Sequence, residues 1–263
     1  MQVREPAVAG SFYPREPAQV AALVDACMAS APEVVPTGTA PKALIVPHAG
    51  FVYSGPIAAT AYAQLAPVRS TIERVVLIGP SHRVPFRGLA ASGASSFLTP
   101  LGAVPVDLDA VSKALALPQV RVLEEAHATE HSLEVQLPFL QRVLDDFALV
   151  PLVAGDASAV DVAEVIDALW GGPETLIVIS SDLSHYSDYA TARALDEQTT
   201  RAIERLEPEA LDFESACGRV GVRGLLVVAR RRGLRVRTLD LRSSGDTAGD
   251  RARVVGYGAY AFS

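Results

Sequence analysis

The chain has 263 residues, of which 49% are hydrophobic and 20% are charged, and its formal net charge at pH 7 is -7. This length and composition are typical of one globular domain with a substantial core, and they exclude a disordered chain. The negative charge argues against a nucleic-acid partner, because binding to phosphates needs a basic surface. We therefore expect a single domain over residues 1–263.

The sequence also lacks the marks of a membrane protein or a disulfide-rich protein. Its start, MQVREPAVAG, has neither the basic nor the apolar region of a signal peptide. No apolar stretch approaches the roughly 18–20 residues that span a bilayer. Two cysteines, Cys27 and Cys217, imply no disulfide framework. These features predict a cytoplasmic protein without a membrane partner.

Helix-like and strand-like segments alternate along the chain, as in α/β folds. In chain order we expect a helix at 17–29, a loop at 31–41, a strand at 43–47, a helix at 56–65, a strand at 75–79 and short strands or a hairpin up to residue 102. Then follow helices at 107–116 and 131–144, a strand at 148–155, a helix at 158–170, a strand at 176–180, helices at 188–206 and 222–232, and strands at 234–241 and 253–262. Pro138 is expected to kink its helix. The pattern predicts one α/β domain with a central, mostly parallel sheet flanked by helices.

Three of the five histidines come just after a short apolar run. His48 follows residues 42–47, His82 follows 74–80, and Asp182 and His185 follow 175–181. Such runs are typical of buried parallel strands, whose carboxyl ends border the ligand crevice of open α/β sheets. Imidazole is a common metal ligand and an acid or base near neutral pH. The pattern therefore predicts a metal or acid/base site at one edge of the sheet.

Each of these motifs also has a purely structural interpretation. PHAGFVYSG (47–55) could be a glycine-containing turn, and Asp182 could cap a helix beside an exposed His185. The repetition of a strand-end histidine in GPSHRVPFRG (79–88) favours a site over two unrelated turns. Alternatively, Asp182 orients His185 and raises its basicity.

Two further segments are weaker candidates. His127 and His131 have i,i+4 spacing, but HATEH is not the HExxH zinc motif, so we expect His127 to be structural and His131 to line a pocket. RSSGDTAGDR (242–251) has the composition of a surface turn. In the alternative interpretation, one of its aspartates, Asp246 or Asp250, completes a metal site.

Several ordered blocks of the sequence together resemble the Memo-like family, whose prokaryotic members are often called AmmeMemoRadiSam system protein B. The blocks are VAGSFYP (8–14), PHAGFVYSGPIAATAY (47–62), GPSHRVPF (79–86), EHSLEVQLPFL (130–140), SSDLSHY (180–186) and CGRVGV (217–222). The resemblance extends over nearly the whole chain and implies a fold similar to class III extradiol dioxygenases, the LigB-like fold. It also implies a pocket of histidines, an aspartate and, in the animal proteins, a cysteine that binds iron or copper.

Matched to these blocks, four positions take roles by resemblance. His48 and His82 correspond to two metal-ligand histidines, and Asp182 and His185 correspond to the pocket aspartate and a third histidine. By similarity to extradiol dioxygenases, His185 would act as the acid/base.

The animal ligand cysteine is expected to have no cysteine counterpart, because SSGD (243–246) falls at its place and Cys217 belongs to a separate block. Asp246 would then complete a set of two histidines and one carboxylate, which is typical of non-haem Fe(II). This makes copper a weaker candidate, and zinc remains compatible.

The resemblance implies an iron-dependent oxidoreductase that acts on a small molecule of unidentified structure. Two alternatives remain open at this point. One is a metal-dependent hydrolase or lyase, and the other is a non-enzymatic metal- or partner-binding protein, because the animal relatives are known chiefly as signalling mediators and a fold does not define a function. The family name also implies a functional link with a radical-SAM protein.

Overall fold

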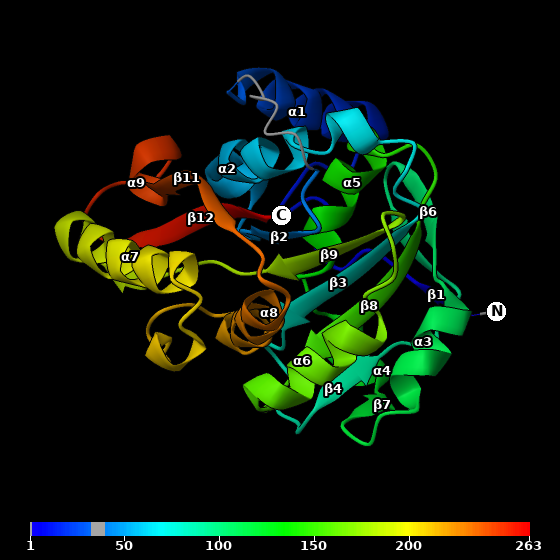
Figure 1. Cartoon of the computed structure of the whole chain (residues 1–263). Helices are drawn as coiled ribbons and strands as arrows, with labels where there is room; N and C mark the ends of the chain where they lie inside the picture. Colours follow the sequence, from blue (N-terminus) through cyan, green and yellow to red (C-terminus); the bar gives the residue numbers. More distant parts are fainter. Residues whose placement is uncertain (1, 33–39) are drawn as a thin grey trace.

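The computed structural model describes residues 2–32 and 40–263, and it shows an α/β fold (Figure 1). The loop expected at 31–41 falls mostly outside these residues. The strands are β1 (Val3–Arg4), β2 (Ala43–Val46), β3 (Arg74–Pro80), β4 (Leu89–Ala91), β5 (Ser96–Thr99), β6 (Gly102–Pro105), β7 (Val120–Val122), β8 (Ala148–Ala154), β9 (Thr175–Ser180), β10 (His185–Ser187), β11 (Val236–Ser243) and β12 (Val254–Phe262). The helices are α1 (Pro17–Ser30), α2 (Phe51–Ala63), α3 (Leu108–Leu115), α4 (Glu124–Ala128), α5 (Leu137–Val143), α6 (Ala159–Ala168), α7 (Tyr189–Glu204), α8 (Arg219–Arg232) and α9 (Ser244–Thr247), with short 3-10 turns η1 (Ala66–Val68), η2 (Glu134–Gln136) and η3 (Pro208–Ala210).

The main sheet has nine strands and is mixed. Along it the order is β10-β12-β2-β9-β3-β8-β4-β7, and β11 pairs with β12. The four central strands β2, β9, β3 and β8 are parallel to one another. β12 runs antiparallel to β2, and β4 runs antiparallel to β8. The expected parallel sheet is thus confirmed at its centre, with antiparallel pairs toward both edges.

Burial on both faces explains why the central strands are continuous apolar runs. Every residue of β2 (ALIV) and of β9 (TLIVIS) is buried. Figure 1 shows α1, α2 and α5 on one side of the sheet and α6 and α8 on the other. The small side chains of α2 (FVYSGPIAATAYA) let this helix pack closely on β2 and β12. A second sheet, β1-β5-β6, has three strands.

Two helices differ from the sequence expectation. α2 begins at Phe51, five residues before the expected start, and contains Pro56 in its interior. The segment expected as one helix over 131–144 is divided into a 3-10 turn and α5. Pro138 lies in the first turn of α5, where a missing N–H costs no helical hydrogen bond, so the helix begins near this proline and is not kinked by it.

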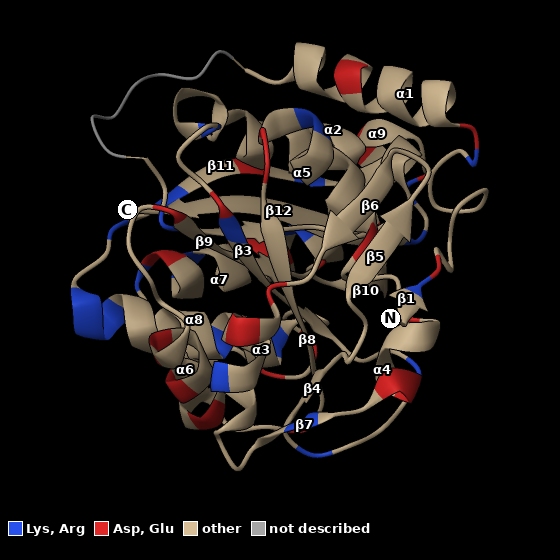
Figure 2. Cartoon of the chain, turned by 90° about the vertical axis from the view of Figure 1, so that its right-hand side faces the viewer, with Lys and Arg blue, Asp and Glu red and all other residues tan. Residues whose placement is uncertain are grey.

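Charged residues of both signs are interspersed along the chain (Figure 2). The basic end of α8 shows the pattern: Arg232 forms an ion pair of 2.6 Å with Asp167, and Arg230 forms one of 3.0 Å with Glu209. This cluster is therefore neutralised locally. Among the described residues, no helix combines the length and the hydropathy needed to cross a membrane.

Candidate metal centre

The parallel order of the central strands brings the predicted strand-end residues together. β9 lies between β2 and β3, so the segments that follow these three strands leave the sheet side by side. His48, His82, Asp182 and His185 all line one cavity of about 700 Å³. The expected convergence at the carboxyl edge of the sheet is what the structure shows.

Three imidazoles in this cavity are close enough to hold one metal ion. His48, His82 and His131 each offer a ring nitrogen, and the three atoms lie within 4.8 Å of one another. The ring centroids are 5.1 Å apart for His48 and His82, 5.4 Å for His48 and His131, and 4.5 Å for His82 and His131. Zinc, copper, iron and nickel all accept imidazole ligands.

Hydrogen bonds select which nitrogen of His48 faces the cavity. Its Nδ1 lies 2.9 Å from Oγ of Ser180. That hydroxyl donates its own proton to the carbonyl of Ser132 at 2.6 Å, so it can only accept from the imidazole. Nδ1 of His48 therefore carries the proton, and Nε2 carries the lone pair that a metal would bind.

The buried carboxylate of Glu130 orients the other two imidazoles. It accepts hydrogen bonds from Nδ1 of His82 at 2.8 Å and from the backbone N–H groups of His82, His131 and Ser132 at 2.7, 2.9 and 2.9 Å. Nδ1 of His131 lies 3.3 Å from the same oxygen that contacts the His82 ring. Burial opposes ionisation, but the hydrogen bonds from His82 outweigh it and hold the pKa of Glu130 at about 2. Glu130 was not among the site residues predicted from the sequence.

Burial keeps two of the ligand candidates, His48 and His131, neutral. Burial, reinforced by the neighbouring His82, lowers the pKa of His48 well below its ordinary value. Burial also lowers the pKa of His131 to about 4. A neutral imidazole is the form that binds a metal cation, so these two rings need not lose a proton at neutral pH.

Asp182 and His185 both line the cavity, but they do not make the contact expected from the sequence. Oδ1 of Asp182 accepts the backbone N–H of His48 at 2.7 Å, and burial raises the pKa of this carboxyl to about 7. Nδ1 of His185 lies 2.8 Å from the carbonyl of Leu183. The carbonyl, and not Asp182, orients the His185 ring and leaves its Nε2 free.

Cys217, whose sequence block is separate from those of the predicted ligands, lies against the imidazole cluster. Its Sγ is 3.2 Å from Nε2 of His48 and accepts the backbone N–H of Asp182 at 3.3 Å. Burial raises the pKa of this thiol, and the nearby Asp182 carboxyl raises it further. Cys217 also lines a second cavity, of about 590 Å³, which shares His82 and His185 with the first. No local spacing connects residue 217 to His48, so only the fold reveals the contact.

The structure does not bring Asp246 to the imidazoles. Its carboxylate accepts hydrogen bonds from the backbone N–H of Ser243 at 2.9 Å and from Oη of Tyr189 at 2.6 Å. It lines a separate cavity of about 340 Å³ with Arg193. The reciprocal cap between Ser243 and Asp246 at the start of α9 turns the carboxylate back on its own helix. The third position near His48 and His82 is occupied by His131.

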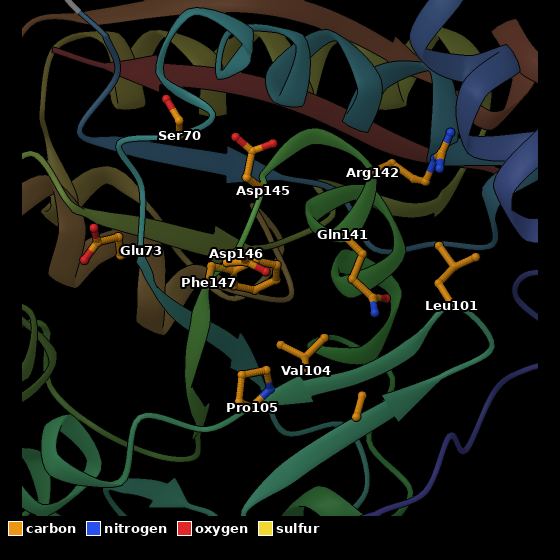
Figure 3. A pocket seen from close by; sticks show the side chains of 11 residues that line it. Ser70, Glu73, Leu101, Val104, Pro105, Gln141, Arg142, Asp145, Asp146 and Phe147 are labelled. Carbon is orange, nitrogen blue, oxygen red and sulfur yellow. The ribbon is translucent and has the colours of Figure 1, made fainter.

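Cavity volume alone would have selected a different place. A cavity of about 770 Å³ is lined by Glu73, Gln141, Asp145 and Asp146 and contains no imidazole or thiol (Figure 3). His127 is also apart from the cluster, because it is buried with Nε2 3.0 Å from the carbonyl of Ala90. The candidate centre is therefore identified by its donor atoms.

Comparison with known proteins gives one consistent result. A family model described as "Memo-like protein" matches residues 4–261. A MEMO1 family protein of Aquifex aeolicus (strain VF5) is 38% identical, covering 98% of this chain and 98% of its own length. A MEMO1 family protein of Ignicoccus hospitalis is 37% identical over 100% of this chain and 99% of its own, and one of Metallosphaera sedula is 32% identical over 99% of each.

Proposed function

Because this chain belongs to the Memo-like family, we propose that it is a metal-dependent enzyme that acts on a small molecule. The observation that carries the proposal is the convergence of His48, His82 and His131, whose ring nitrogens lie within 4.8 Å of one another at the wall of a 700 Å³ cavity. Three protein ligands leave positions of a metal open, as catalytic sites require. A cavity of this volume fits a small-molecule ligand.

The donor set fits a divalent transition metal. The Nδ1 atoms of His48 and His82 are engaged by Ser180 and Glu130, an arrangement that orients the remaining nitrogens and raises their basicity. The metal proposed here is Fe(II), and the reaction an oxidation of the small molecule by dioxygen, after the class III extradiol dioxygenases that the sequence resembles. A bound Fe(II) ion would supply the redox chemistry.

Residues of the protein itself would take up and transfer a proton. His185 is the proposed acid/base, because the Leu183 carbonyl at 2.8 Å occupies Nδ1 and leaves the lone pair of Nε2 for a substrate hydroxyl. Asp182 would act as a positioning residue, since it anchors the backbone N–H of His48 at 2.7 Å.

Hydrolysis is a second candidate that one observation favours. The Fe(II) expectation depended on a carboxylate ligand, whereas the cluster consists of three imidazoles. Three histidines and a water are a donor set typical of catalytic zinc. A zinc-dependent hydrolase is therefore the alternative reaction for the same centre.

Metal analysis of protein purified without oxygen tests the centre itself. We expect about one equivalent of metal in the wild type and none in the His48→Ala/His82→Ala double variant, with the far-UV circular dichroism of both unchanged. Stoichiometric metal retained by the folded double variant would remove these residues from the centre.

Oxygen uptake with a panel of catechols then separates the reactions. Iron with oxygen consumption supports the oxidoreductase. Zinc without oxygen consumption supports the hydrolase, and iron without turnover of any substrate supports a protein that only binds metal.

A further inference from the structure

Tyr186 occupies a backbone position that favours glycine, at the rim of the imidazole cavity. Its φ is 61°, in the left-handed region. In the pairing of β10 with β12, His185 is opposite Val255 and Ser187 is opposite Val254, so Tyr186 is the extra residue of a β-bulge. Bulges next to active sites re-aim side chains. The bulge here directs a tyrosine to a cavity wall.

Burial does not explain why a large side chain is retained at this position. The Tyr186 residue is 64% exposed, although it lines the same cavity as the three imidazoles. Its ring lies at 5.6 Å from the ring of His185. Disfavoured backbone conformations persist only where the surrounding structure enforces them, and they cluster at active sites and ligand-binding sites. An exposed aromatic face at a cavity rim is a surface on which a flat ligand can stack.

Arg253 adds a positive charge beside this ring. Its Cζ lies 5.2 Å from the centre of the Tyr186 ring, and it lines the same cavity. Within residues 2–32 and 40–263 no ion pair neutralises it, whereas Arg251, two residues earlier, lies 3.8 Å from Asp246. The carboxylate of Asp250, which also lines the cavity, accepts the backbone N–H of Ala252 at 2.8 Å. A guanidinium stacked on an aromatic ring keeps its planar edge free for a carboxylate.

The remaining wall of the cavity combines apolar and aromatic residues with polar ones, among them Asp182, Ser244 and Asp250. The apolar and aromatic residues include Phe12, Ala49, Tyr53, Val255 and Tyr257. A ligand that fills this space would have a flat apolar body and one anionic group. We propose that Tyr186 and Arg253 form a recognition subsite for a small planar carboxylate, with the ring stacking on the ligand and the guanidinium binding its carboxylate. The proposal names the substrate class of the proposed metal-dependent reaction, and in that respect rests on it.

Benzoate and its neutral isostere benzamide test the subsite by isothermal titration calorimetry, with phenyl phosphate as a third probe. Each is titrated into metal-loaded and chelator-treated protein, because a metal could itself bind benzoate. We expect benzoate to bind at least about tenfold more tightly than benzamide in both forms, and more tightly than phenyl phosphate.

Two variants separate the charge from the ring. Arg253→Gln should bring the affinities for benzoate and benzamide within about twofold of each other. Arg235 is an exposed arginine at the other end of β12, beside Ser263, and Arg235→Gln should keep the preference for benzoate. Tyr186→Asn should weaken both probes by a similar factor and should not lower the melting temperature, because asparagine tolerates the left-handed conformation.

The outcomes distinguish this proposal from the proposed function. Equal affinities for benzoate and benzamide in the wild type, or a preference that survives Arg253→Gln, would overturn the subsite. A preference for benzoate seen only in the metal-loaded form would show that the metal binds the carboxylate of benzoate. Tighter binding of phenyl phosphate than of benzoate would show that the guanidinium binds phosphate. Either result would also overturn the subsite. Loss of the metal centre with the benzoate preference intact would overturn the proposed function alone.

Discussion

The carboxylate of Glu130 accepts two hydrogen bonds from His82, one from Nδ1 at 2.8 Å and one from the backbone N–H at 2.7 Å. The same carboxylate accepts the backbone N–H of His131 at 2.9 Å. One buried acidic residue thus sets the position of two of the three imidazoles. The geometry of the candidate centre depends on a side chain that is not itself a proposed ligand.

Replacing Glu130 with glutamine should weaken metal binding without removing a ligand. The amide has the same shape, but its NH2 group cannot accept the N–H bonds that the carboxylate accepts. We expect Glu130→Gln to lower the affinity by about 10–100-fold, measured by competition with a chelator. Glu125→Gln, at an exposed position nearby, is the matched control. A Glu130→Gln affinity equal to that of the control would contradict the positioning role.

The third ligand can be identified with a pair of substitutions. His131→Ala should abolish stoichiometric metal binding, because it removes one of only three nitrogens in the cluster. Asp246→Asn should leave binding unchanged, since this carboxylate is engaged by Ser243 and Tyr189. Metal content by elemental analysis decides the matter, and the reverse pattern would return Asp246 to the ligand set.

Cobalt substitution tests whether the thiol of Cys217 joins the three imidazoles. Its Sγ lies 3.2 Å from Nε2 of His48, within the neighbourhood of a bound ion. With three imidazole ligands, the cobalt protein should show no thiolate-to-cobalt charge-transfer absorption in the near ultraviolet. The Cys217→Ser variant should then give the same spectrum as the wild type. A charge-transfer band that disappears in the variant would show that Cys217 is a ligand.

His127 should make the folded state sensitive to acid. Burial lowers its pKa to about 4 from an ordinary value of 6.5, so between these values the unfolded chain binds more protons than the folded protein. The contribution of His127 to the free energy of unfolding should therefore be fully present above pH 6.5. It should fall by up to about 3 kcal/mol as the pH drops toward 4.

Urea unfolding of wild type and His127→Gln at pH 7 and pH 4.5 checks this expectation. The variant should lose less stability than the wild type over that interval, by about 2–3 kcal/mol. The other histidines titrate in both proteins, so their effects cancel in the difference. Equal losses in the two proteins would show that His127 does not cause the acid sensitivity.

Arg4 should be far more important for stability than an exposed arginine in a similar ion pair. It pairs with Glu134, and both side chains are almost fully buried. Arg4→Met leaves the Glu134 charge buried, which should cost about 3–5 kcal/mol. Arg142→Met breaks an exposed 2.7 Å pair with Asp25 and should cost less than about 1 kcal/mol. Similar urea midpoints for the two variants would contradict the assigned difference.

Local patterns in the sequence were enough for most elements of the fold. The expected helix at 17–29 is α1 (Pro17–Ser30), and the apolar run expected at 75–79 is β3 (Arg74–Pro80). The segment 131–144 was harder, because leucines at helical spacing indicate a buried face but not where the helix begins. There the backbone follows the contacts of Glu130 and the first-turn preference of Pro138.

The sequence by itself determined the α/β alternation, the family, and the meeting of His48, His82 and His185 at one edge of the sheet. These conclusions follow from local information: the periodicity of each segment, short sequence blocks, and the residues directly after each buried strand. Only the tertiary structure decided that His131, held by Glu130, joins two of these imidazoles and that Cys217 lies beside them, because no spacing along the chain encodes such contacts. It also turned Asp246 away, since the cap on Ser243 directs the carboxylate to its own helix.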